Sequence, residues 1–170
     1  MIDKIPDFNA VAQKLIKYAQ TIAEVEMINF INRNFENQGF MDASLQPWTG
    51  RKNGFDTGRA LLKKSGELQD RISVTSSSTK QVEVTAASKY AKIHNEGGVV
   101  NIQVTPKMKR WFWYMYKTTK NERYKAMALS KKTAFTFTMP KRQFMGPSIA
   151  FNKLIEQKFL NMIEMRFKQA

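Results

Sequence analysis

The strongest constraint on how this chain can fold is an apolar stripe of helical period near its N-terminus. Its members recur at alternating steps of three and four residues: Phe8, Val11, Leu15, Tyr18, Ile22 and Val25. Such spacing is close to a coiled-coil seam and predicts an α-helix over residues 8–36. Asp7 is the expected N-cap, and Gly39 is the expected stop. Because the apolar surface is broad, we expect the helix to pack on a sheet or on a neighbouring subunit.

The rest of the chain alternates between β and helical patterns. Period-two alternation predicts a hairpin and two further strands, over residues 72–76, 82–86, 100–104 and 135–139. A short helix or turn is expected over 88–98, and a helix over 148–170 whose apolar residues lie along one side. This order predicts an α+β fold, an antiparallel sheet of about four strands packed by long N-terminal and C-terminal helices. At 170 residues, we expect a single domain over residues 1–170.

Two segments depart from these patterns. Five glycines and prolines punctuate residues 38–58 around Trp48, which predicts a long mobile loop with a docked tryptophan. Between the last two strands, residues 106–132 predict a basic aromatic helical insertion. Its aromatic residues follow one another too closely to share one helix face, and they form the candidate interface: Trp111, Phe112, Trp113, Tyr114 and Tyr116. The insertion either folds back over the sheet, contacts another subunit, or stacks on nucleic acid.

The sequence predicts no catalytic, cofactor-binding or metal-binding residue. The chain has no cysteine and one histidine, which removes disulfides, thiol catalysis and nearly every structural zinc site. His94 has Glu96 two residues on, a pair more typical of a structural histidine than of a catalytic one. There is no Gly-rich phosphate loop, and the acidic residues of the central third are too scattered for two-metal chemistry. We therefore expect a non-enzymatic protein without a cofactor.

The positive charge is concentrated in one part of the chain. Lys and Arg number 28 against 14 Asp and Glu, and residues 101–150 hold 11 of the basic residues with one acidic residue. Such a block favours an anionic partner, either nucleic acid or an acidic protein surface, although a solvated basic face would have the same composition. No apolar run reaches the 18 or so residues that span a bilayer, and residues 1–8 lack a signal-peptide pattern. We expect no membrane contact and a protein that stays inside the cell that makes it.

Three motifs in a fixed order carry a resemblance to a known family. They are LLKKSGELQDRI (61–72), YAKIHNEGG (90–98) and PKRQFMGPS (140–148). With them, the chain resembles the phage virion morphogenesis family over roughly residues 28–165. It departs from the family at three positions: family members often have Thr in place of Ser65, Gln in place of Asn95, and Ala or Ser in place of Lys141. Only the departure at Lys141 changes the role of the residue. The insertion at 106–132 varies in the family, so the resemblance implies nothing about it.

This resemblance implies a structural protein of the neck or tail end of tailed phages and prophages, which completes the tail or joins head to tail. It also implies assembly into a homo-oligomeric ring of six or twelve subunits that contacts other neck or tail proteins. The protein would then be found in the virion, and in the host cytoplasm during assembly. The alternative is an accessory protein that binds nucleic acid nonspecifically through residues 107–132, and contact with phage DNA fits either function.

The motif residues are suited to structural roles. The complete set is Trp48, Ser65, Gly66, Leu68, Tyr90, Ile93, His94, Gly97, Gly98, Pro140, Arg142 and Phe144. Ser65 and Gly66 are expected to end a helical turn over 59–64, and the two adjacent glycines to reverse the chain. Arg142 can pair a carboxylate or cap exposed carbonyls. We expect five of the set to share one packed region: Trp48, Tyr90, Ile93, His94 and Phe144.

Overall fold

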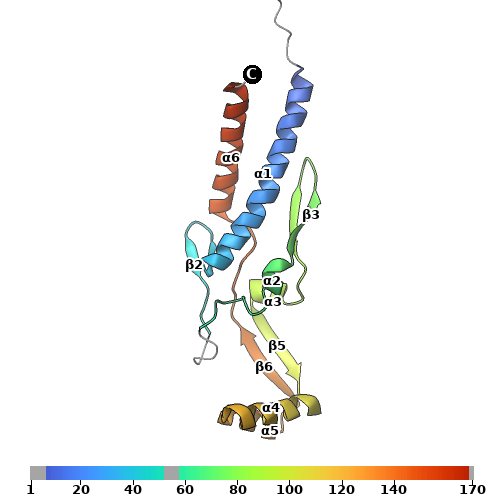
Figure 1. Ribbon diagram of the computed structural model, residues 1–170, viewed down its shortest axis with the longest axis vertical. Helices are drawn as coiled ribbons and strands as arrows, with labels where there is room; N and C mark the ends of the chain where they lie inside the picture. The colour runs from blue at the N-terminus through green and yellow to red at the C-terminus, as the bar shows by residue number, and fades with distance from the viewer. Residues whose placement is uncertain (1–6, 52–57, 169–170) are drawn as a thin grey trace, which may run out of the picture. The chain divides into compact units, whose positions relative to one another are not determined.

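The computed structural model describes residues 7–51 and 58–168. Within the single domain that the sequence predicts, contacts gather into two compact units. Unit 1 combines the chain up to Glu96 with the chain from Lys141, and unit 2 is Gly97–Pro140. Figure 1 shows the elements of both units. Unit 2 is therefore an insertion between two halves of unit 1.

The long N-terminal helix is confirmed as α1, Phe8–Glu36. The Asp7 side chain accepts hydrogen bonds from the backbone N–H groups of Asn9 and Ala10, as an N-cap does. The expected stop at Gly39 is wrong, because α1 ends at Glu36 and the left-handed residue after it is Gln38, with φ of 52°. Gly39 instead begins a strand, where a Cβ would lie 2.7 Å from the Gln46 carbonyl oxygen. That glycine serves a close backbone approach, not a helix end.

Burial along α1 is confined to its C-terminal part. The buried residues are Glu26, Phe30, Ile31, Asn34 and Phe35. The stripe that predicted the helix lies mostly before them, and Phe8 and Val25 are 70% and 52% exposed. The apolar period correctly predicts the helix, but most of the stripe is not core, because the buried core of unit 1 gathers only around the last turns of α1.

The described residues form three antiparallel sheets of two strands each. These pair β1 (Gly39–Met41) with β2 (Leu45–Pro47), β3 (Ile72–Ser77) with β4 (Val82–Ala86), and β5 (Gly98–Gln103) with β6 (Ala134–Met139). The α+β class and all four predicted strands are confirmed, whereas the single four-stranded sheet is wrong. Alternation fixes which residues are extended, but it does not fix which strand each one pairs with.

A hairpin occupies the first half of the expected loop at 38–58, which sequence punctuation alone did not reveal. The β1–β2 turn is fastened to the start of the C-terminal helix: Ser148 Oγ donates to the Met41 carbonyl at 2.7 Å, and Ile149 N–H donates to Asp42 Oδ1 at 3.0 Å. Residues 52–57 of that loop lie outside the described residues, and its mobility stays a prediction.

The other helices differ from the sequence expectations in detail. No helix covers 59–64; instead α2, Glu67–Asp70, begins after Gly66, whose φ of 82° makes it a left-handed N-cap. The segment 88–98 contains α3, Ala91–Glu96, and the C-terminal helix is α6, Ile149–Lys168. The insertion is helical but divided into α4, Pro106–Thr119, and α5, Glu122–Leu129, by Lys120 at φ 56°. A left-handed residue at that position ends α4 and lets α5 fold against it.

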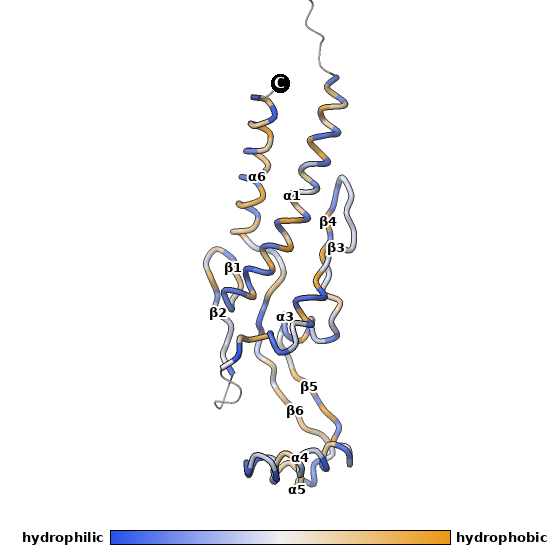
Figure 2. Tube along the Cα trace, viewed as in Figure 1, coloured by the Kyte–Doolittle hydropathy of each residue, from blue (hydrophilic) through white to orange (hydrophobic). Residues whose placement is uncertain are grey.

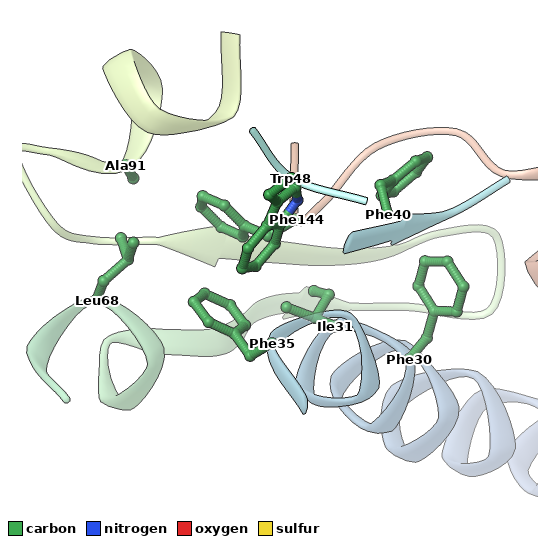
Figure 3. Close-up of a cluster of buried hydrophobic side chains, with 8 residues drawn as sticks. All are labelled: Phe30, Ile31, Phe35, Phe40, Trp48, Leu68, Ala91 and Phe144. Carbon is green, nitrogen blue, oxygen red and sulfur yellow. The ribbon is translucent and has the colours of Figure 1, made fainter. Parts of the chain in front are cut away.

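The core of unit 1 gathers side chains from segments far apart in the sequence. Figure 3 shows its members: Phe30, Ile31, Phe35, Phe40, Trp48, Leu68, Ala91 and Phe144. Phe35 lies at the centre, with ring centroids 5.6 Å from Trp48 and 5.2 Å from Phe144. Phe35 and Phe144 are completely buried. The last turns of α1 and the PKRQF motif therefore meet in one aromatic cluster.

Candidate interaction surfaces

Two asparagines hold the backbone at Phe144 in place. Asn34, completely buried on α1, donates from Nδ2 to the Phe144 carbonyl at 3.1 Å and accepts from Met41 N–H at 3.0 Å. Asn95 Oδ1 accepts from the N–H groups of Phe144 and Met145 at 3.0 and 3.1 Å. Asn34 belongs to none of the three motifs, although an asparagine between the apolar residues Ile31 and Phe35 is the kind of signal that marks a buried hydrogen bond.

Arg142 and Trp48 fasten the loop after β2. Arg142 Nε donates to the Thr49 carbonyl at 2.9 Å and Nη2 to the Gly50 carbonyl at 3.4 Å. Trp48 Nε1 donates to the Gln143 carbonyl at 2.6 Å. Of the two roles expected for Arg142, these bonds select the capping of carbonyls. Burial lowers the pKa of Arg142, and the nearby charge of Arg51 lowers it further.

His94 lies at the same junction, half-buried. Its carbonyl accepts from Arg142 N–H at 2.8 Å, and its buried Nδ1 has no hydrogen-bond partner among the described residues. Burial lowers the pKa of His94, and the positive charge of Arg142 lowers it further. Within residues 7–51 and 58–168, no three His, Cys, Asp or Glu side chains come together as a metal site would require. Both effects favour the neutral form of the imidazole at this junction.

The other motif residues divide between core and surface. Leu68 is buried in the core, whereas Ser65 is exposed and its Oγ accepts from Glu67 N–H at 3.4 Å. Tyr90 was expected in the packed region, and this is wrong: the ring is 49% exposed, with Lys89 Nζ 5.0 Å from its centroid. Ile93 is half-buried beside it. Because α3 is only six residues long, it presents little beyond Ala91 to the core.

The remaining motif residues act on the backbone. Gly97 and Gly98 have φ values of 74° and 138°, which L side chains rarely adopt, and β5 begins at Gly98. Pro140 directly follows β6, as expected.

The first candidate surface lies on α1 and α6, which run side by side in unit 1 (Figure 1). Lys158 Nζ of α6 lies 3.2 Å from the buried carboxylate of Glu26, and the Arg166 guanidinium lies 4.2 Å from the centre of the Tyr18 ring. These contacts join the two helices. Yet none of the described residues of α6 is buried, and apolar and polar stretches alternate along both helices in Figure 2.

The exposed apolar residues on these helices form two separate strips. On α1, Val11, Tyr18 and Val25 repeat every seven residues and are exposed, whereas Leu15 and Ile22 of the same seam are half-buried. On α6, the exposed strip is Leu160, Ile163 and Phe167. At 100° per residue, this strip lies opposite Lys158, so the apolar residues of α6 do not lie along one side as expected but occupy more than half its circumference.

The second candidate surface lies on unit 2. Phe112 is buried there, with its ring centroid 6.0 Å from Phe135 and 6.4 Å from Tyr124. Trp111, Trp113 and Tyr114 are exposed, by 50%, 36% and 64%. Tyr116 is half-buried, and its hydroxyl donates to Glu122 Oε1 at 3.0 Å. The five predicted interface aromatics therefore divide between packing within unit 2 and solvent, and their role in a subunit contact stays a prediction.

Comparison with known proteins places the chain in a family. Residues 8–164 match the model of the phage virion morphogenesis family, so the chain belongs to it. No curated protein and no solved structure matches it. The family is one of virion structure and assembly, not one known for catalysis, and membership associates the chain with the virion. Among the described helices, none is long and apolar enough to cross a membrane.

Proposed function

We propose that this protein completes the tail or joins head to tail at the neck of a phage virion, and that it acts as a closed homo-oligomeric ring. The observation that carries the proposal is the pair of exposed apolar strips on α1 and α6. Family membership supports the virion role. The strips favour a second copy of the chain as the partner. An apolar seven-residue repeat is the surface on which another helix packs, and α6 covers the repeat on α1 only in part.

The two strips differ in position and residues, which suits a ring. A contact between the α6 strip of one copy and the α1 strip of the next is heterologous, and such contacts close when the rotation between copies divides a full turn. Six or twelve copies would suit the symmetry that the resemblance implies for tails and portals. Other neck or tail proteins would then bind the assembled ring, which forms in the host cytoplasm and remains in the virion.

Light scattering and particle images at low and high concentration test the ring. We expect a mass of six or twelve times the 19.7 kDa of the chain, together with annular particles. Changing Leu160→Ser with Phe167→Ser should give a monomer with unchanged helical content, because both side chains are exposed on α6. The matched control, Val99→Ser with Phe137→Ser, removes two exposed apolar side chains from unit 2 and should keep the ring.

Salt separates this contact from an electrostatic one. An apolar ring should persist as salt rises, whereas assembly through charges should dissociate. A wild-type chain that stays monomeric in solution and shows no rings at high concentration would refute the proposal. So would a ring that survives the α6 double substitution, because the strip would then not be the contact.

A further inference from the structure

We infer that unit 2 carries a binding site for the phosphate backbone of DNA, formed by one face of α4. The inference goes beyond the ring and does not require it, since every residue that it uses lies within Gly97–Pro140. Its basis is the arrangement of cations and aromatic rings around this helix.

Three of the four cations of α4 share the face that points away from the packing of unit 2, whereas Lys109 is half-buried outside it. Successive helical residues turn by 100°, so Lys107, Arg110, Tyr114 and Lys117 fall within an arc of about 80°. All four are exposed, and the centre of this arc lies opposite the buried Phe112. Lys107 and Lys117 are ten residues apart, about 15 Å along the helix axis. The structure thus presents an elongated basic strip with a tyrosine within it.

The positive charge of this strip is not neutralised from within. Residues 106–132 hold nine basic residues and one acidic residue, Glu122. That carboxylate lies 3.5 Å from Lys125 Nζ on its own helix and also accepts the Tyr116 hydroxyl. Across the described part of the chain, no ion pair is formed by Lys107, Arg110 or Lys117. A field of one sign of this kind attracts a polyanion.

The aromatic rings favour nucleic acid over an acidic protein. Trp111 and Trp113 border the strip on its two sides, and Tyr114 lies within it, so each exposed ring is next to a cation. The central part of a protein interface is depleted of charge, whereas this arrangement would bury lysine and arginine beside every ring. Nucleic acid accommodates both, because phosphates pair with the cations and bases stack on the rings.

The Trp111 ring is held in place before any ligand binds. Its centroid lies 5.3 Å from that of Phe112 and 5.9 Å from that of Tyr124, in edge or tilted contacts. Tyr114, by contrast, makes no ring contact among the described residues and is 64% exposed. Substituting Tyr114 therefore removes a stacking surface without disturbing the packing of unit 2.

The test is fluorescence anisotropy of the full chain with labelled duplex and single-stranded DNA of one length, across a salt series. We expect nonspecific binding in the micromolar range at low salt, weakening steeply as salt rises. The triple variant Lys107→Gln, Arg110→Gln, Lys117→Gln should reduce the slope of log affinity against log salt by roughly two to three, close to one per cation. Affinity near 0.1 M salt should fall at least tenfold.

A matched control removes the same charge from unit 1. Lys64→Gln, Lys80→Gln, Lys92→Gln changes three exposed lysines and should leave the slope within about one of the wild-type value. Equal slopes for wild type and the α4 triple variant would overturn the inference, as would a wild-type chain that binds neither DNA at low salt. A triple variant that keeps DNA binding but loses the ring would show that α4 contacts protein instead.

The variant Tyr114→Ala distinguishes single-stranded from duplex DNA as the ligand. If a single strand is the ligand, this variant should bind single strands roughly fivefold or more weakly, because a stacked base is lost. If duplex is the ligand, affinity for both DNAs should stay within about twofold of the wild type. Each of these results supports the phosphate site, while a variant that loses duplex binding alone contradicts it.

Discussion

The core of unit 1 and the outer face of α4 in unit 2 place their aromatic residues in opposite environments. In unit 1, Phe35 and Phe144 are completely buried, and their rings join α1 to the PKRQF motif. In unit 2, the consecutive residues Trp113 and Tyr114 face solvent on a short helix. A ring enclosed by other rings stabilises a fold, whereas a ring left in water beside lysines is available to a partner. Similar residue types thus support stability in the unit 1 core and are available for recognition on the outer face of α4.

Charge follows the same division. Unit 2 has nine basic residues and a single acidic one, whereas the rest of the chain has 19 and 13. In unit 1, the buried carboxylate of Glu26 is paired with both Arg33 and Lys158, at 3.1 and 3.2 Å. The contrast indicates that unit 1 uses part of its charge to join its own elements and that unit 2 directs charge outward.

The largest expected effect contrasts the same substitution in the two units. Phe144→Ala should destabilise unit 1 by about 3–5 kcal/mol, because it removes a completely buried ring that packs on Phe35. Phe137→Ala in unit 2 should cost less than about 1 kcal/mol, because that ring is 41% exposed. Urea unfolding of both variants measures the difference. Equal losses would mean that the two units do not differ as described.

A smaller effect tests whether polar contacts hold the same junction. Asn34→Ala should cost about 2–4 kcal/mol, since it leaves the Phe144 carbonyl and the Met41 N–H without their partner. Asn29→Ala, an exposed position on the same helix, serves as the matched control and should change stability by no more than about 0.5 kcal/mol. A mild Asn34 variant would show that the aromatic cluster alone fixes the PKRQF segment.

The sequence indicated far more of the secondary structure than of its assembly. The period of the α1 stripe predicted the bounds of this helix, and alternation predicted the positions of four strands. The division of the strands among three sheets and the exposure of the stripe were not predictable, because both depend on contacts with distant segments. The β1–β2 hairpin is local, but its three-residue strands are too short to show alternation. A seam at positions such as Val11 and Tyr18 has the same pattern whether its partner is a core or a second molecule.

The candidate surfaces were predictable only in part, because local pattern shows that residues must be exposed but not which ones. The crowding of Trp111, Phe112 and Trp113 required some rings to be exposed, and the structure shows which ones. The sequence predicts one apolar side for the C-terminal helix, whereas in the structure the exposed strip of α6 lies opposite Lys158, which pairs with Glu26 of α1. Asn34 and Asn95 both bond to the backbone of Phe144, which lies 110 residues after the first and 49 residues after the second. Such distant partners cannot be read from the sequence around each asparagine.

The smallest expected effect concerns pH. Burial lowers the pKa of His94 in the folded protein below its ordinary value of 6.5, so the unfolded chain binds a proton first as pH falls. The stability that depends on the neutral imidazole is therefore present above pH 6.5 and is lost as pH falls from 6.5 through the lower pKa of the folded protein. Thermal melts should show wild type losing more stability than His94→Gln between about pH 7.5 and 5.5, by less than about 1 kcal/mol because the ring is half-buried. Parallel pH profiles would exclude this contribution.

The insertion of unit 2 between the halves of unit 1 sets an order for biosynthesis. Asn34 bonds to Phe144, 110 residues later, and Arg142 bonds to Thr49, 93 residues earlier. Both strands and both helices of unit 2 lie before Lys141, so they leave the ribosome ahead of Phe144, which completes the aromatic core of unit 1. The cost of closing so long a loop grows only slowly with its length. Until the C-terminal residues emerge, however, the last turns of α1 remain uncovered, and the nascent chain is then most prone to aggregation.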